Sequence, residues 1–200
     1  MINHIGNWII ANNIELLGAI LGIAYIFFSI RQSIFTWPIG LLTSILYAWV
    51  FFVSKLYADM GLQLYYVFIS IYGWYEWLYG NKSNKEDTLK VSRLTSKLGY
   101  LLLLFSILIF FLIWFVLDNY TDSPVPVADS LATSLSLVAT WMLARKILEH
   151  WLIWIFVDTF SIGLFWYKEL FPTVFLFIVY TIMAVIGFFE WKKEYSKLAS

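Results

Sequence analysis

Four side chains in the segment 151–168 are spaced so that they share one face of a helix. Trp151, Trp154, Asp158 and Ser161 stand at positions i, i+3, i+7 and i+10, which the 3.6-residue period brings to one side. Asp158 lies well inside this apolar segment, where a charged group costs about 2.5–3.5 kcal/mol in a membrane-spanning helix. One interpretation is that the carboxyl accepts hydrogen bonds from the hydroxyls of a ligand or balances a cationic ring of that ligand. The alternative is that it forms an interhelical hydrogen bond that locks the helix bundle.

The two tryptophans of this face are suited to a flat cationic ring. Stacking of an indole on such a ring contributes about 0.5–2 kcal/mol through cation–π attraction. The alternative is that Trp151 and Trp154 belong to the aromatic belt at the membrane–water interface. The belt interpretation is stronger for Trp151, because it lies near the end of the segment.

A second candidate face belongs to the segment 60–79. Gln63 and Tyr66 stand one helical turn apart, followed on the same face by Ser70, Gly73 and Trp77. The amide of Gln63 offers both a donor and an acceptor, which suits a carboxamide or an aminopyrimidine. Alternatively, this amide forms hydrogen bonds between neighbouring helices.

Three further residues complete the predicted site. Trp37 begins the segment 35–54, and Thr140 supplies a hydroxyl for a sugar, although threonine also bonds to its own helix backbone. Tyr180 matches Tyr66 in an internal repeat and either flanks a central axis or simply packs. The predicted substrate-binding residues are therefore Gln63, Tyr66, Trp37, Thr140, Trp151, Trp154, Asp158, Ser161 and Tyr180.

The chain lacks the residue sets of common catalytic and metal sites. It has no cysteine, its only histidines are His4 and His150, and it has no Gly-x-x-x-x-Gly-Lys-Ser/Thr phosphate-binding loop. One charged cluster, Arg145 and Lys146 with Glu149 and His150, resembles an acid/base set, but we interpret it as a basic loop. We therefore predict no catalytic residue, no metal, no cofactor, no nucleic-acid partner and no enzyme.

Long apolar helices must position these side chains. The 200-residue chain is 62% hydrophobic and 13% charged, whereas soluble domains average about 45–50% apolar and about 25% charged residues. Since a helix needs about 20 apolar residues to cross a bilayer, we predict an all-α polytopic membrane protein. The seven predicted transmembrane helices are 14–31, 35–54, 60–79, 98–117, 129–145, 151–168 and 173–191.

The basic residues are distributed unevenly between the two sides of these helices. Eleven of the 13 lysines and arginines fall on one side, and only Lys55 and Lys168 fall on the other. The positive-inside rule then places the N-terminus outside and the C-terminus in the cytoplasm. The charged linker 80–97 lies on the cytoplasmic side, and the acidic, proline-containing loop 118–128 lies outside.

The chain also aligns with itself at an offset of 114 residues. Twelve identities occur without a gap between positions 15 and 77, where about 4–5 are expected by chance in such a composition. They include Arg31 with Arg145, Trp37 with Trp151, and the pattern Gly-x-x-Glu-Trp at 73–77 and 187–191. Helix packing in a receptor or scaffold is the alternative explanation of this repeat.

The repeat predicts the organisation of the chain. Residues 1–200 form a single membrane domain, with one three-helix repeat at 14–79 and another at 129–191. Residues 80–128 supply the linker, a connecting helix and the outer loop. Because four helices separate corresponding members, the two triplets have the same orientation, and the fold is 3+1+3.

Several segments resemble the PnuC family of vitamin transporters. They are KLYADMGLQLYYVFISIYGWYEW at 55–77, LARKILEHWLIWIFVD at 143–158, and GFFEWKK at 187–193. The resemblance covers about residues 15–193. It implies a fold similar to a full-length SWEET transporter, a bacterial inner-membrane location, and facilitated diffusion of nicotinamide riboside with trapping by a cytoplasmic kinase.

Two departures from the riboside pattern leave the vitamin open. Riboside-type members carry a denser tryptophan cluster where this chain has only Trp151 and Trp154, and many have Gly-Gln where it has Ala139 and Thr140. Nicotinamide riboside is the leading substrate, and thiamine or another vitamin is the alternative. The lipid bilayer and a small-molecule vitamin are the expected partners, and association into a homo-oligomer stays open.

Overall fold

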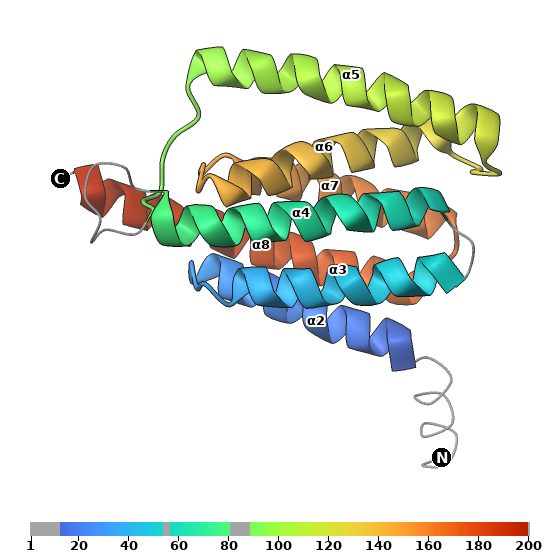
Figure 1. Cartoon of the computed structure of the whole chain (residues 1–200), viewed down its shortest axis with the longest axis horizontal. Coiled ribbons are helices and arrows are strands. Elements are labelled where there is room, and N and C mark those ends of the chain that lie inside the picture. Colours follow the sequence, from blue (N-terminus) through green and yellow to red (C-terminus); the bar gives the residue numbers. More distant parts are fainter. Residues whose placement is uncertain (1–12, 54–56, 81–88, 200) are drawn as a thin grey trace. The chain divides into compact units, whose positions relative to one another are not determined.

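The computed structural model is all-helical in the part of the chain that it describes, residues 13–53, 57–80 and 89–199 (Figure 1). Its helices are α2 (Asn13–Ile30), α3 (Thr36–Val53), α4 (Tyr57–Tyr79), α5 (Ser96–Tyr120), α6 (Pro126–Ala144), α7 (His150–Tyr167) and α8 (Phe171–Ala199). These seven helices match the seven predicted segments in order and position. The prediction of an all-α chain is confirmed.

Four of the described helices are long and apolar enough to cross a bilayer by length and composition. The spans are Thr36–Val53, Ser96–Tyr120, Pro126–Ala144 and Phe171–Lys197, and the apolar part of α2, Leu17–Ile30, is shorter. α4 and α7 hold polar residues such as Gln63 and Asp158 within their length. Membrane crossing by all seven helices stays a prediction.

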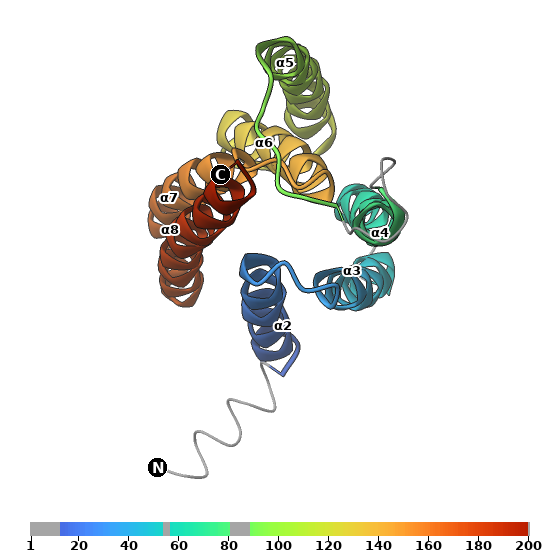
Figure 2. The ribbon, with the colours of Figure 1, turned by 90° about the vertical axis from the view of Figure 1, so that its left-hand side faces the viewer.

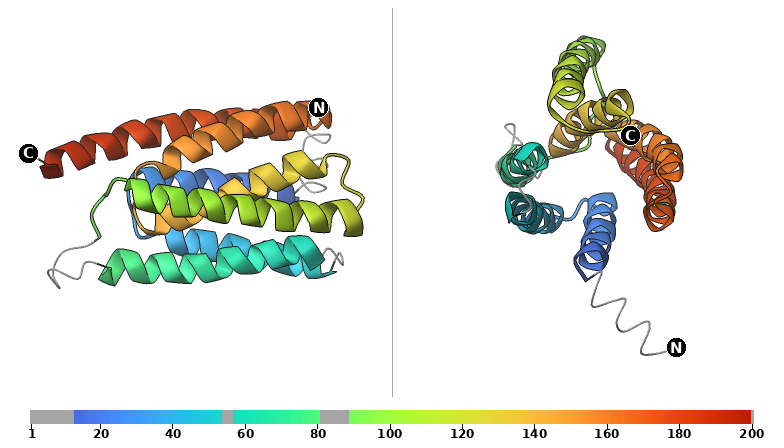
Figure 3. Two further views of the ribbon diagram at one scale, coloured as in Figure 1. Left: turned by 90° about the horizontal axis from the view of Figure 1, so that it is seen from above. Right: turned by 90° about the vertical axis from the view of Figure 1, so that its right-hand side faces the viewer.

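The chain divides into two compact units, Met1–Trp74 and Tyr75–Ser200. In the first unit, α2 packs against α3. In the second unit, α5 packs on α6, α6 on α7 and α7 on α8, and Figure 2 shows α7 and α8 side by side. The last turn of α4 also belongs to the second unit. The C-terminal end of α8 extends beyond the neighbouring ends of α5–α7 (Figure 3).

Local sequence signals begin several of these helices. The Thr95 hydroxyl accepts a hydrogen bond from the backbone N–H of Leu98 and so caps α5. Pro126 begins α6, where the first backbone N–H groups have no partner within the helix, so that the missing N–H of proline costs nothing. Asp129 lies in the first turn of α6, where the helix dipole stabilises its negative charge. The beginnings of these two helices therefore follow from ordinary helix-terminus chemistry.

The turn between α2 and α3 recurs, 114 residues later, between α6 and α7. Gln32 and Lys146 both have the left-handed backbone, with φ of 52° and 50°. The N–H of Gln32 donates to Ser29 O at 3.0 Å, and the N–H of Lys146 donates to Leu143 O at 2.9 Å. The two turns thus share their backbone conformation, although their side chains differ.

The side chains that follow these turns also correspond. The Thr36 hydroxyl donates to Ser33 O at 2.8 Å, and His150 Nδ1 lies 2.7 Å from Ile147 O. Because a carbonyl only accepts, His150 Nδ1 carries the proton. The local geometry therefore repeats at the offset found in the sequence, while the 3+1+3 arrangement itself stays a prediction.

The glycines of the Gly-x-x-Glu-Trp pattern each face a tryptophan. A Cβ on Gly73 would lie 2.3 Å from the Trp37 ring, and one on Gly187 would lie 2.6 Å from the Trp151 ring. Real Cβ contacts are never so short, so only glycine admits each indole at this distance. These glycines therefore allow close contact between neighbouring helices.

The tryptophans of the pattern are buried against protein. Trp77 and Trp191 are 3% and 0% exposed, and their ring centroids lie 6.2 Å apart. Each indole is therefore enclosed by other side chains. Glu76 of the same pattern pairs with Arg145 at 2.9 Å.

Candidate functional site

The α7 face carries two buried polar side chains. Asp158 and Ser161 are each 4% exposed, and they stand one turn apart on the helix. Neither makes a hydrogen bond or ion pair with any residue that the structure describes. Burial of a carboxyl without a partner is costly, so the second unit holds a polar position suited to a ligand's hydroxyl or positive charge.

The two tryptophans of this face have different surroundings. Trp154 is half-buried, which leaves part of its indole accessible. Trp151 is buried, and its ring centroid lies 4.6 Å from that of His150 and 5.8 Å from that of Trp191. The packing alternative is thus stronger for Trp151 than for Trp154, while a binding role for either stays a prediction.

Thr140 and Tyr180 lie on the two helices that pack against α7. The Thr140 hydroxyl donates to Ser136 O at 2.8 Å within its own helix, which is the structural alternative that the sequence left open. Tyr180 is half-buried, and its ring lies edge-on to Phe177 at 5.6 Å between centroids. Both side chains therefore have packing roles, and their contact with a substrate stays a prediction.

The other predicted site residues belong to the first unit. Trp37 is 0% exposed and lies against Gly73. Gln63 and Tyr66 are half-buried and stand on successive turns of α4, where Tyr66 lies edge-on to Tyr65 at 5.5 Å. Trp37 is therefore enclosed by protein, whereas Gln63 is only half-buried.

Ser44 is a further candidate that the predicted site did not include. It is 5% exposed on α3, and no described residue forms a hydrogen bond with it. The 114-residue offset aligns it with Asp158, so the repeat was the signal that could have found it. The same position of both repeats thus buries a polar group.

Lys146 was assigned to a basic loop, but it is buried. Its Nζ lies 4.5 Å from the centroid of the Trp77 ring, and its side chain is 5% exposed. Burial lowers the pKa of this amine from 10.5 to about 8, while Glu194 acts in the opposite direction. The α6–α7 turn therefore contains a desolvated cation held against an aromatic face.

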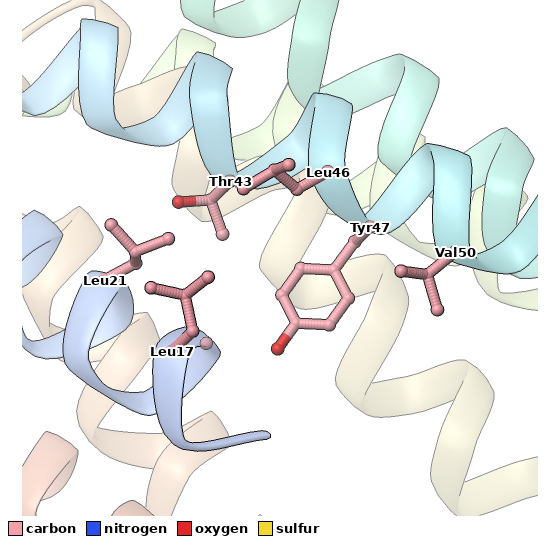
Figure 4. Close-up of a pocket in the computed structure, with 7 residues that line it drawn as sticks. Leu17, Leu21, Thr43, Leu46, Tyr47 and Val50 are labelled. Carbon is pink, nitrogen blue, oxygen red and sulfur yellow. The ribbon is translucent and has the colours of Figure 1, made fainter. Parts of the chain in front are cut away.

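A small apolar pocket lies between α2 and α3 (Figure 4). It is lined by Leu17, Gly18, Leu21, Thr43, Leu46, Tyr47 and Val50 and has about 230 Å³ of empty volume, including space open to the outside. The Tyr47 hydroxyl points toward α2, close to Gly18. None of the predicted site residues lines this pocket. Leu17 and Leu46 are exposed, so we interpret it as a surface groove.

Metal binding has no support in the described ranges. No three side chains of the His, Cys, Asp and Glu types come together there. Within the second unit, aromatic rings, the buried carboxyl of Asp158 and nearby hydroxyls suit recognition of a polar organic molecule.

A family model described as nicotinamide mononucleotide transporter matches residues 12–193. The chain belongs to the PnuC family of vitamin transporters. Within this family it is similar to the nicotinamide riboside transporter PnuC of Escherichia coli (strain K12), with 24% identity over 89% of this chain and 84% of the relative. Its relatives of the PnuC family are transporters, in agreement with the prediction that the chain is not an enzyme.

Two further comparisons concern substrate and fold. The riboflavin/roseoflavin transporter RibM of Streptomyces davaonensis is 23% identical over 88% of this chain and 83% of its own length. The crystal structure of the vitamin B3 transporter PnuC superposes with a TM-score of 0.72 at 25% identity, covering 93% of this chain and 83% of that one. The relatives of this chain are thus named for different vitamins.

Proposed function

We propose that this protein carries nicotinamide riboside across the bacterial inner membrane by facilitated diffusion with alternating access. Phosphorylation by a cytoplasmic kinase then traps the vitamin inside the cell. The N-terminus lies outside and the C-terminus in the cytoplasm. The names of the riboside-transporting relatives support the substrate, and the uneven distribution of basic residues supports the orientation.

The buried carboxyl of Asp158 is the structural observation that best supports nicotinamide riboside as the substrate. Nicotinamide riboside presents a cationic pyridinium ring, a carboxamide and sugar hydroxyls. A carboxylate that has no partner among the described residues favours the positive charge of the ring or accepts hydrogen bonds from the hydroxyls. Trp154, four residues earlier in the chain and half-buried, offers an indole face to the same ring.

The remaining predicted residues complete this proposal. The Gln63 amide pairs with the carboxamide, and Ser161 bonds a sugar hydroxyl. Tyr66, Tyr180 and the hydroxyl of Thr140 border the path, and Trp37 and Trp151 support it from their packed positions against glycine.

Thiamine and riboflavin are the alternative substrates. Thiamine also carries a flat cationic ring, so an aromatic wall and a carboxylate suit it equally. Riboflavin is favoured by the similarity to RibM, but its ring system is neutral and gives Asp158 no charge to balance. Charge therefore separates the first two vitamins from the third.

Calorimetric titration of the purified protein with all three vitamins tests the proposal. Nicotinamide riboside should bind most tightly, and Asp158→Asn should weaken its binding about ten- to hundredfold, because a hydrogen bond to a charged group contributes about 1.5–3 kcal/mol. Asp118→Asn is the matched control, since this aspartate is exposed at the end of α5.

Two results would contradict the proposal. Tighter binding of thiamine or riboflavin would reassign the substrate. Unchanged riboside binding in Asp158→Asn, in a protein that still unfolds cooperatively, would remove the carboxyl from the site.

A further inference from the structure

A short stretch between α4 and α5 is tied to the turn between α6 and α7. We call residues 91–94 the strap. The backbone N–H of Ser92 donates to Lys146 O at 2.9 Å, and Ser92 O accepts from the N–H of Leu148 at 2.9 Å. Ser92 and Ile147 thereby form an isolated parallel bridge. Two backbone hydrogen bonds fix the strap on the turn.

Glu149 adds a second attachment. Its carboxylate accepts from Arg93 Nε and, through Oε2, from the backbone N–H of Leu94 at 2.8 Å. The Glu149 side chain is 17% exposed, so these charge-assisted bonds lie partly out of water. The Arg93 guanidinium also lies over the ring of Tyr195 on α8, 5.8 Å from its centroid.

Apolar contacts seat the strap as well. Val91 is 5% exposed. The Leu94 side chain packs against the buried cluster of Val138, Met142 and Ile147. Undocking the strap would expose these side chains and break its hydrogen bonds to the turn.

The opposite end of the α6–α7 pair is tied by charge. Lys168, which ends α7, donates to Asp129 Oδ1 in the first turn of α6 at 3.0 Å. Ser123 donates to the other oxygen of Asp129 at 2.7 Å. Each end of the pair therefore has its own polar attachment.

We propose that the strap and the Asp129–Lys168 pair brace α6 and α7 at both ends, so that the two helices move as one rigid element throughout transport. Glu149 is the positioning residue that keeps the strap seated. The proposal rests on the proposed function only where movement during transport is concerned. The docking of the strap is independent of any substrate.

Reversible cross-linking tests the rigid movement. The chain contains no cysteine, so Arg93→Cys with Glu149→Cys introduces a single pair for a short bis-methanethiosulfonate reagent. Glu149→Cys removes the carboxylate that seats the strap, and the link replaces that attachment. In proteoliposomes, the linked protein should therefore transport at least as fast as the unlinked double variant. Arg93→Cys alone, given the same reagent, is the control. A block of transport that is relieved on reduction would overturn the proposal, because the strap would then have to undock.

Hydrogen exchange tests the docking itself. Glu149→Leu removes both attachments of the carboxylate, whereas Glu149→Gln keeps an acceptor for the Leu94 N–H. Exchange of the 91–95 peptide should rise at least tenfold in Glu149→Leu and much less in Glu149→Gln, with α6 unchanged. Equally fast exchange in the unaltered protein and in Glu149→Leu would refute the brace. This readout stands even if the protein carries no riboside.

Discussion

At the scale of single residues, glycine and tryptophan determine how closely the helices pack. Trp37 on Gly73 and Trp151 on Gly187 repeat one contact in two places. The sequence contained the signal, since both pairs fall on the 114-residue offset. It did not reveal which indole meets which glycine, because helix–helix contact depends on side-chain direction as well as spacing.

Gly187→Ala should destabilise the protein. The added Cβ would lie 2.6 Å from the Trp151 ring, and such overpacking costs about 1–3 kcal/mol. Gly163→Ala, on α7, is the matched control, because nothing lies within 4 Å of its added Cβ and alanine favours a helix. Thermal unfolding in detergent should show a lower Tm for Gly187→Ala alone. Equal Tm values for the two variants would argue against the tight contact.

Lys146 should give the stability an alkaline pH dependence. Its pKa is about 8 in the folded protein against 10.5 for a free side chain. Between these values the unfolded chain binds more protons, so the free energy of unfolding rises with pH over this window. Lys146→Met should flatten the rise, measured as Tm from pH 7.5 to 10.5. Lys193→Met, at an exposed position, is the control. An identical slope in Lys146→Met would contradict the assignment.

Trp154 and Gln63 should contribute directly to substrate affinity. Trp154→Ala removes an indole face, and we expect about a three- to thirtyfold weaker binding of nicotinamide riboside by calorimetry, in line with the cation–π contribution. Gln63→Ala should weaken it through the lost amide. Trp166→Ala provides the comparison, because Trp166 is 64% exposed on the same helix. A loss of affinity in Trp166→Ala as large as in Trp154→Ala would point to a general defect.

At the scale of elements, the helix positions were predictable and some of their ends were not. Sustained apolar runs fixed the seven segments because each helix needs enough length to cross a bilayer. α8 continues to Ala199, beyond the predicted end at 191, because lysine, glutamate and alanine favour a helix even where hydropathy has ended. The strap escaped prediction for a different reason. Its bridge uses backbone groups, which leave no mark in the side-chain pattern.

At the scale of the whole molecule, composition indicated the class of the protein, and the resemblance of three segments indicated its family. The predicted meeting of residues from both repeats in one site depends on tertiary arrangement, which spacing along the chain does not specify. The orientation in the membrane is also a prediction at this scale, and it follows from charge alone.

Single cysteines test that orientation cleanly, because the chain has none of its own. Thr121→Cys and Ser196→Cys both replace exposed residues. In intact cells, a membrane-impermeant maleimide should label Thr121→Cys at once and Ser196→Cys only after permeabilisation. The opposite order of labelling would invert the topology.

Uptake of nicotinamide riboside into proteoliposomes tests the central claim most directly. With no ATP and no ion gradient, the vitamin should enter until its inside and outside concentrations are equal, and an enclosed riboside kinase with ATP should then drive further accumulation. Absence of entry above protein-free vesicles would contradict riboside transport. Accumulation beyond equality without the kinase would contradict facilitated diffusion.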